Sequence, residues 1–124
     1  MSKAGKALLV VAHGSRREAS NEEVRRLSER IAQQAGGRYD MVRTAFLELA
    51  EPSIPDGIEQ CIQDGAGEVV VMPYFLSAGR HVAEDIPHEV APKQQQHPGV
   101  KIHIAPYLGS ADGIAGLMLQ MSET

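Results

Sequence analysis

The chain has 124 residues, 43% of them hydrophobic, and a formal net charge of −4 at pH 7. This length suits one domain with a single core, and no apolar run approaches the roughly 20 residues that cross a bilayer. The negative charge argues against a nucleic-acid partner, which needs a concentrated basic surface. The single cysteine, Cys61, excludes an internal disulfide and a cysteine-based metal cage. We therefore expect one cytoplasmic domain over residues 1–124, with no membrane and no nucleic-acid partner.

The first predicted element is a short buried strand. Lys6–Ala12 is almost continuously apolar, as expected of a parallel strand that is covered on both faces. Ser20 and Glu23 then form a capping box, which predicts a helix with Ser20 as its N-cap. Apolar residues recur at helical spacing until Gly36, where a glycine commonly ends a helix.

The middle of the chain repeats this strand-helix order. Asp40–Phe46 is rich in residue types that favour a sheet. Ser53 is placed to cap a second helix, which we expect to end at Gly65. Glu68–Met72 contains three consecutive valines and is the segment most typical of a strand.

The last part of the chain predicts two further helices and one strand. A helix is expected to begin near Arg80, and Pro87 and Pro92 are expected to shorten or break it, because proline removes a backbone donor. Val100–Ala105 predicts a fourth strand, and a final helix is expected from Ser110 onward. Four strand-helix units indicate a three-layer α/β fold with a four-stranded parallel sheet.

The ends of three predicted strands carry polar side chains that suit metal chemistry. His13 follows the first strand, Glu48 follows the second, and His81 lies after the loop that leaves the third. Ligands bind beyond the carboxyl ends of parallel strands, so these side chains are candidates for one site. Imidazole and carboxylate suit Fe2+, Co2+ or Ni2+, and three protein ligands leave coordination positions open. Each residue alone could equally be an ordinary hydrogen-bonded or solvated side chain.

Basic and hydroxyl side chains lie beside these histidines. Ser15 and Arg16 follow His13, and Arg80 precedes His81. They could bind substrate carboxylates through charge-assisted hydrogen bonds, or they could be exposed turn residues.

The other histidines give weaker indications. His88 could share a helical face with His81, although Pro87 lies between them. His97 lies in a glutamine-rich loop and is expected to be solvated, and His103 lies within the fourth strand and is interpreted as structural.

The sequence resembles the class II tetrapyrrole chelatases, namely the sirohydrochlorin cobalto- and ferrochelatases of the short CbiX/SirB type. The matching segments are LLVVAHGSR (8–16), AFLELAEPSIPDGI (45–58), VVVMPYFLSAGRHVAEDIP (69–87) and APYLG (105–109). The resemblance implies a flavodoxin-like sheet, with His13 and His81 as catalytic histidines and Glu48 as their acidic partner. Larger relatives contain two such lobes that enclose the tetrapyrrole, so the resemblance suggests that this single lobe forms a homodimer.

The expected activity is insertion of a divalent metal (Co2+, Fe2+ or Ni2+) into sirohydrochlorin, with the metal as substrate and no permanently bound cofactor. His13, Glu48 and His81 are the expected catalytic and metal-binding residues. The residues expected to bind the tetrapyrrole are Ser15, Arg16, Phe75, Leu76, Ser77, Gly79 and Arg80, with Tyr74 and Ile86 as further candidates for packing against the ring.

Two other functions remain open from the residues. A non-catalytic carrier or sensor of metal or tetrapyrrole would use the same side chains. A phosphoryl-transfer enzyme is a more distant alternative, because the loop after the first strand lacks the glycine patterns that bind nucleotides, and Ala12 stands where histidine phosphatases have an arginine.

Overall fold

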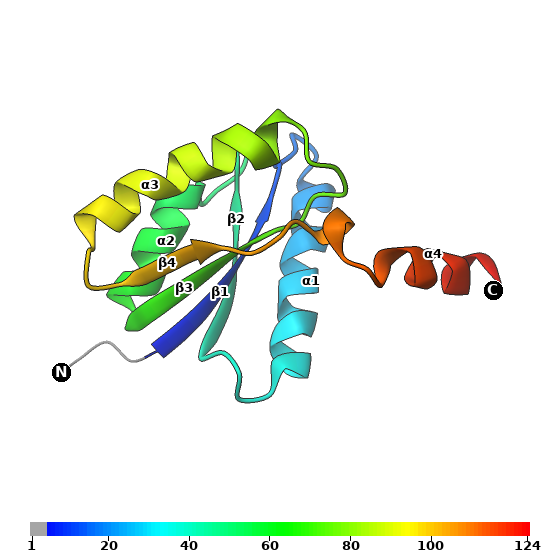
Figure 1. Ribbon diagram of the computed structural model, residues 1–124, viewed down its shortest axis with the longest axis horizontal. Coiled ribbons are helices and arrows are strands. Elements are labelled where there is room, and N and C mark those ends of the chain that lie inside the picture. Colours follow the sequence, from blue (N-terminus) through cyan, green and yellow to red (C-terminus); the bar gives the residue numbers. More distant parts are fainter. Residues whose placement is uncertain (1–4) are drawn as a thin grey trace.

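The computed structural model describes residues 5–124 and contains one parallel sheet with helices on both faces (Figure 1). The strands lie in the order β2-β1-β3-β4, so that β1 and β3 are the inner strands. This arrangement confirms the predicted three-layer, flavodoxin-like fold. The elements in chain order are β1 (Gly5–Ala12), α1 (Glu18–Ala35), β2 (Met41–Phe46), α2 (Ile54–Gln63), β3 (Ala66–Pro73), the π-helix η1 (His81–Asp85), α3 (Ile86–Gln96), β4 (Lys101–Ile104), the 3-10 helix η2 (Leu108–Ser110) and α4 (Ile114–Ser122).

The four strands form where the sequence predicts them, with differences of one or two residues at their ends. Each helix connection returns the chain to the same end of the sheet, which is why all strand pairs are parallel. In the register, Val11 of β1 lies between Ala45 of β2 and Pro73 of β3. The carboxyl ends of these three strands therefore lie at one edge of the sheet.

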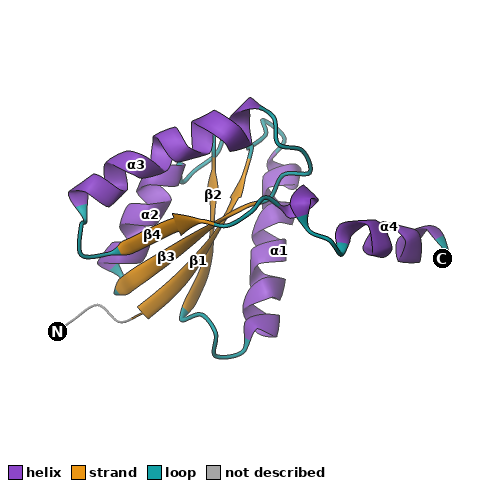
Figure 2. Ribbon diagram, viewed as in Figure 1, coloured by secondary structure: helices purple, strands orange, loops and turns teal. Residues whose placement is uncertain are grey.

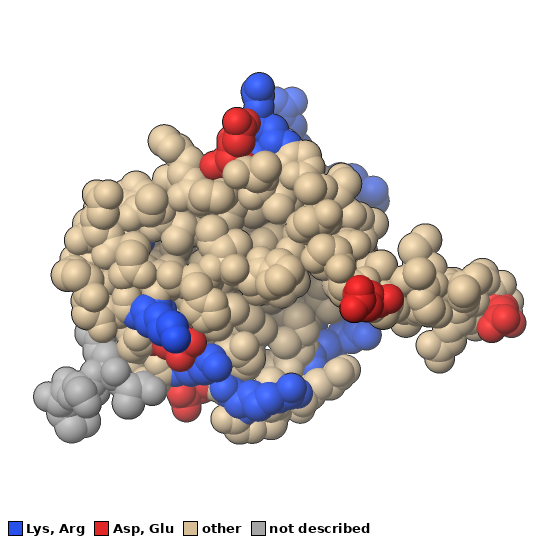
Figure 3. Space-filling model, in the orientation of Figure 1, with Lys and Arg blue, Asp and Glu red and all other residues tan. Residues whose placement is uncertain are grey.

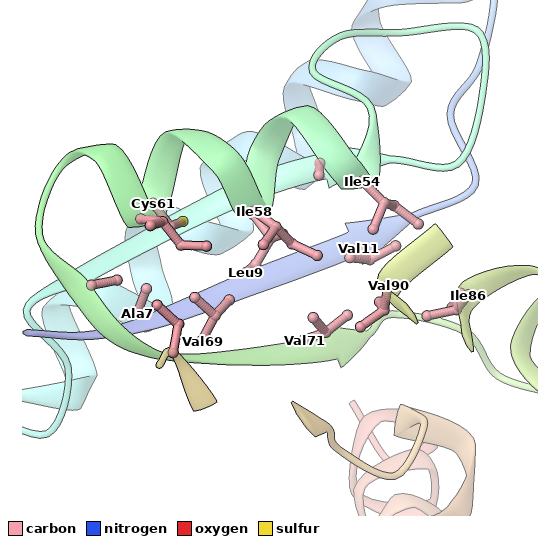
Figure 4. Close-up of a cluster of buried hydrophobic side chains, with 14 residues drawn as sticks. Ala7, Leu9, Val11, Ile54, Ile58, Cys61, Val69, Val71, Ile86 and Val90 are labelled. Carbon is pink, nitrogen blue, oxygen red and sulfur yellow. The ribbon is translucent and has the colours of Figure 1, made fainter. Parts of the chain in front are cut away.

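Helices α2 and α3 cover one face of the sheet and α1 covers the other (Figure 2). The main core lies between the sheet and α2 with α3, where alternate residues of β1 and β3 face apolar side chains of the two helices (Figure 4). The largest fully buried side chains of this core include Leu9, Ile54, Ile58, Ile62 and Ile86. Burying one such side chain stabilises the fold by about 1.5–3 kcal/mol.

Helix α1 begins earlier than predicted. Its first residue is Glu18 and its N-cap is Arg17, so Ser20 lies inside the first turn. The cause is Asn21, which is buried and whose side chain bonds both the backbone N–H and the backbone C=O of Ser15. These bonds satisfy polar groups of the preceding loop and fix where the helix starts. The predicted end of the helix is confirmed, with Gly36 as C-cap.

The third helical segment is longer than predicted and begins with a wide turn. η1 runs directly into α3, and the backbone N–H of Ile86 bonds the carbonyl of His81, five residues earlier. Pro87 lies directly after this wide turn, and the helix continues through it. Pro92 lies inside α3 and does not end it, so the expected break is wrong.

The fourth helix differs most from the prediction. α4 forms, but it projects away from the sheet instead of covering it (Figure 1). Leu117, Met118, Leu119 and Met121 of this helix are 52–66% exposed. Within residues 5–124, none of the helices has the length and apolar character required to cross a membrane.

An ion-pair network joins the ends of α2 and α3. The Glu59 carboxylate accepts hydrogen bonds from Lys93 Nζ at 2.9 Å, His97 Nε2 at 2.8 Å and Gln63 Nε2 at 2.7 Å. The expectation that His97 is solvated is therefore wrong. The bond from Lys93, followed by those from Gln63 and His97, lowers the pKa of Glu59 from 4.5 to about 2.

This network predicts acid-sensitive stability. A carboxylate whose pKa is lowered by folding stabilises the native state above its unfolded-state pKa, and that stabilisation is lost as the pH falls towards the folded pKa. We expect E59Q to have a lower melting temperature than the wild type near pH 7, and the difference to shrink from pH 4.5 downward and vanish near pH 2. Thermal unfolding followed by circular dichroism across this range measures it. E23Q, at an exposed glutamate of α1, is the control, and a wild-type/E59Q difference that is independent of pH would contradict the prediction.

Candidate functional site

The loops after β1 and β2 are held together by backbone hydrogen bonds. Leu47 N–H donates to the carbonyl of Ala12 at 2.9 Å, and Glu48 N–H donates to the carbonyl of His13 at 3.0 Å. Gly14 makes this approach possible, because it has φ +95° and a Cβ at this position would lie 1.7 Å from the Glu48 carbonyl oxygen. The close approach places the side chains of His13 and Glu48 beside one another.

His13 and Glu48 form a direct pair. His13 Nε2 lies 2.6 Å from Glu48 Oε2, and both side chains are about half exposed at the rim of the sheet. His13 and Glu48 therefore lie close together, as predicted.

His81 joins the pair from the π-helix η1. Its ring lies 4.6 Å from the ring of His13, centroid to centroid, with the planes 62° apart in an edge-to-face arrangement. Its Nδ1 atom lies 2.8 Å from Asp85 Oδ2, one turn further along the same segment. Wide π-type turns are frequent at functional sites, and this one places His81 over the end of β1.

The carboxylate partners fix which nitrogen of each ring carries the proton. An ionised carboxylate only accepts hydrogen bonds, so the proton of neutral His13 lies on Nε2 and that of neutral His81 lies on Nδ1. Nδ1 of His13 and Nε2 of His81 then keep free lone pairs. Each ring can therefore bind a metal ion or accept a proton through the nitrogen that faces away from its carboxylate.

A pocket of about 230 Å³ extends from this cluster. Its lining residues are Leu47, Glu48, His81, Asp85, His88 and Glu89. His88 thus shares the site with His81, as helical spacing suggested, and the intervening Pro87 does not separate them. Neither Glu89 nor the pairing of Asp85 with His81 was identified from the sequence. A usable signal was present, because Asp85 lies four residues after His81 and Glu89 lies four residues after Asp85.

The arrangement is open and does not enclose an ion. Within residues 5–124, no group of three or more His, Cys, Asp and Glu side chains is positioned to hold a metal ion in this conformation. His13, Glu48 and His81 are neighbours, yet one nitrogen of each histidine is engaged by a carboxylate.

The polar residues expected to bind substrate lie around the rim. Ser15 is mainly a loop residue, since its backbone bonds Asn21 and its Oγ accepts from Arg17 N–H at 3.0 Å. Arg16 is exposed. Arg80 is also exposed and its Nε lies 3.3 Å from Glu84.

The residues expected to contact the tetrapyrrole in and beside the loop between β3 and η1 differ in their exposure. Leu76 is 72% exposed, and Ser77 and Gly79 are exposed beside it. Phe75 is partly buried against the core. Ile86 is fully buried, so the expectation that it packs against the substrate ring is wrong. The remaining candidate, Tyr74, is partly exposed and lines a separate apolar groove.

This loop is fixed to the segment after β4. Gly109 N–H donates to the carbonyl of Phe75 at 3.0 Å, and a Cβ on Gly109 would lie 1.8 Å from the carbonyl oxygen of Leu76. The PYLG segment and the loop after β3 therefore form one rim beside the histidines.

Known proteins share this sequence and fold. The chain is 40% identical over 102 residues to the chloroplastic sirohydrochlorin ferrochelatase of Arabidopsis thaliana, covering 82% of this chain and 44% of that protein. It is 42% identical over 81 residues to the sirohydrochlorin cobaltochelatase of Methanococcus maripaludis, covering 65% of this chain and 55% of that protein. The chain thus spans about half the length of these relatives.

Solved structures of proteins named SirB and CbiX share the fold of this chain. The sirohydrochlorin chelatase SirB of Bacillus subtilis subspecies spizizenii, in complex with cobalt, matches with a TM-score of 0.84 and 28% identity, covering 97% of this chain and 50% of SirB. A CbiX protein of Marinobacter aquaeolei VT8 matches with a TM-score of 0.80 and 26% identity, covering 95% of this chain and 94% of that chain. The CbiX family model matches residues 7–124. The chain therefore belongs to the CbiX family, as the resemblance of its motifs predicts.

Proposed function

We propose that the chain is a sirohydrochlorin chelatase, which inserts Co2+ or Fe2+ into the tetrapyrrole as part of a cobalamin or siroheme pathway. The observation that carries the proposal is the cluster of His13, Glu48 and His81 at the carboxyl edge of the sheet. Family membership and the names of the relatives support it. The free, buried Cys61 accords with the cytoplasmic location that we also propose.

The chemistry requires groups that bind a metal ion and accept protons. Insertion exchanges two pyrrole N–H protons for one divalent ion. The lone pairs on His13 Nδ1 and His81 Nε2 can bind the incoming ion or accept a pyrrole proton, and Glu48 can balance the added charge. An open cluster suits this task because an ion that is a substrate must enter and leave.

The tetrapyrrole is proposed to lie across the rim. The pocket of about 230 Å³ is smaller than the roughly 300–1,000 Å³ typical of small-molecule sites, so the macrocycle cannot enter it. The ring carboxylates would be bound by Arg16 and Arg80, and the exposed Leu76 would contact the ring face.

A second copy of the chain is proposed to cover the other face of the ring. The rim is open on one side, and the chain covers only 50% of SirB, which leaves that protein room for a second unit of similar size. Sedimentation of the proposed homodimer should give twice the 13.4 kDa chain mass.

The experiment that tests the activity is anaerobic metal insertion followed by absorbance. Purified protein and sirohydrochlorin are mixed with Co2+, Fe2+ or Ni2+ separately, against protein-free reactions. The expected result is many turnovers per chain above the uncatalysed rate, and the fastest metal identifies the pathway. Stoichiometric binding without acceleration for any metal would reject the enzyme and favour a carrier.

Asp85 is predicted to act through His81. Removing its charge with D85N weakens the bond that orients the His81 ring and fixes its proton on Nδ1. We expect kcat to fall by about 10–100-fold, the usual effect of losing such a supporting group, while the KM for sirohydrochlorin changes little. Steady-state kinetics across pH separates this effect from lost substrate binding.

D64N is the matched control for D85N. Asp64 also forms an exposed pair, with Arg43 at 2.6 Å, but it lies at the C-cap of α2. Its replacement should leave kcat unchanged. If folded D85N turns over like the wild type, Asp85 has no positioning role.

A further inference from the structure

Helix α4 carries an apolar surface that residues 5–124 leave exposed. No charged residue lies between Ile114 and Ser122, and Figure 3 shows acidic residues only at the two ends of the projecting segment on the face in view. Ile114, Leu117, Met118 and Met121 recur at helical spacing and form one continuous apolar stripe. Three of these side chains are among those 52–66% exposed. An uncharged helix of this kind is normally buried.

The same chain has an apolar groove on the α1 face of the sheet. Its lining residues are Val10, Leu27, Ile31, Met72, Tyr74 and Leu108, and its volume is about 230 Å³. Val10 and Met72 are register partners on β1 and β3. The groove therefore lies between α1 and the strands β1 and β3, on the face of the sheet that α1 covers.

This groove is where the fourth helix of a wound α/β sheet would pack. α2 and α3 cover one face, and α1 alone covers the other (Figure 1). In a sheet with helices on both faces, a helix after β4 would lie beside α1. Here Leu108 lines the groove, but α4, which follows, projects away from the sheet.

The geometry points to a second copy of the chain as the occupant. To enter the groove of its own chain, α4 would have to reverse its direction across residues 111–113. A second copy offers the same groove without that reversal, and reciprocal exchange satisfies both helices and both grooves. The match covers 94% of the Marinobacter chain, which leaves that chain no room for a second lobe, so a second groove of this kind has to come from another copy.

We propose that two copies exchange α4, so that the Ile114–Met121 stripe of each helix packs into the groove between α1 and β3 of the other chain. This inference rests on the homodimer of the proposed function and adds the surface that forms it. Exchange also connects assembly to the site, because Tyr74 and Leu108 of the groove flank the rim loop that carries Phe75 and Leu76.

Disulfide trapping tests the exchange. In the full chain carrying L27C and M118C, exchange places the cysteine at position 118 of each copy against the cysteine at position 27 of its partner. The native Cys61 is fully buried and does not interfere. Mild oxidation should give a covalent dimer on non-reducing gels, whereas each single variant should stay monomeric. A fast-migrating monomer with an internal disulfide, the absence of any crosslink, or a dimer from M118C alone would overturn the proposal.

A charge placed on the stripe gives a second readout. M118K should shift the mass in solution from twice 13.4 kDa to 13.4 kDa, because the lysine would be buried in the groove of the partner without a counter-charge. The control Q120K adds the same charge on another side of α4 and should stay dimeric. A dimer that M118K leaves intact, or a monomeric wild type, would overturn the exchange. Neither readout involves metal or tetrapyrrole, so a failed insertion assay would reject the proposed activity and leave this inference standing.

Discussion

Replacing His81 with alanine is expected to reduce catalysed metal insertion by about 10²–10⁴-fold, the usual contribution of a positioned acid-base group. His81 is the member of the cluster that comes from η1, and its Nε2 lone pair is available to the metal or to a pyrrole proton. The variant also leaves Asp85 without its ring partner. Initial rates of insertion with the preferred metal measure the effect.

The fold should survive the substitution. His81 is partly exposed and lies outside the hydrophobic core, so a change in stability within about 0.5 kcal/mol is expected. H103A is the matched control, because His103 is an exposed histidine on β4 that pairs with Glu68 of β3 at 3.1 Å and does not line the site pocket. Near-wild-type turnover by a folded H81A protein would remove His81 from the mechanism.

The strands and their parallel arrangement could be predicted because local pattern and topology agree. Runs such as Lys6–Ala12 and Glu68–Met72 are apolar enough to identify buried parallel strands, and right-handed crossovers then bring their carboxyl ends together. That is why His13, Glu48 and His81 could be assigned to one edge before any contact was known. The capping of α2 by Ser53 was predictable for the same reason, since the Ser53 hydroxyl bonds a backbone N–H only three residues away.

The errors arise where a distant contact decides the outcome. The start of α1 depends on Asn21 bonding Ser15 across a loop, not on the capping box at Ser20. His97 bonds Glu59, which is 38 residues away in the chain. The position of α4 is not set by packing against its own sheet, from which the helix projects. None of these contacts leaves a periodic signal in the sequence.

Gly14 shows most clearly what the sequence could not reveal about the site. A glycine after a strand-end histidine is compatible with many turns. The register of β2 against β1 brings the Glu48 carbonyl over Gly14, and this close approach is why residue 14 must be glycine.

G14A is therefore expected to disable the site as fully as the loss of a catalytic side chain. A Cβ at residue 14 would lie 1.7 Å from the carbonyl oxygen of Glu48 and 2.9 Å from its carbonyl carbon, so the two loops must separate. Separation breaks the 2.6 Å contact between His13 and Glu48. Misplacing reacting groups by about 1 Å can cost 10²-fold, and we expect at least about that loss in kcat/KM.

The matched control is G36A, because it separates backbone strain from the clash. Gly36 also has a positive φ, +62°, but apart from its chain neighbours no atom of the described residues lies within 4 Å of a Cβ built on it, and it caps α1. Both variants incur the cost of about 1–3 kcal/mol for a left-handed residue with a side chain. Only G14A should lose activity when both are assayed below their melting temperatures, and only G14A should shift the NMR signals of the His13 and His81 rings. Equal activity of the two variants would mean that the close approach at Gly14 is not needed for the reaction.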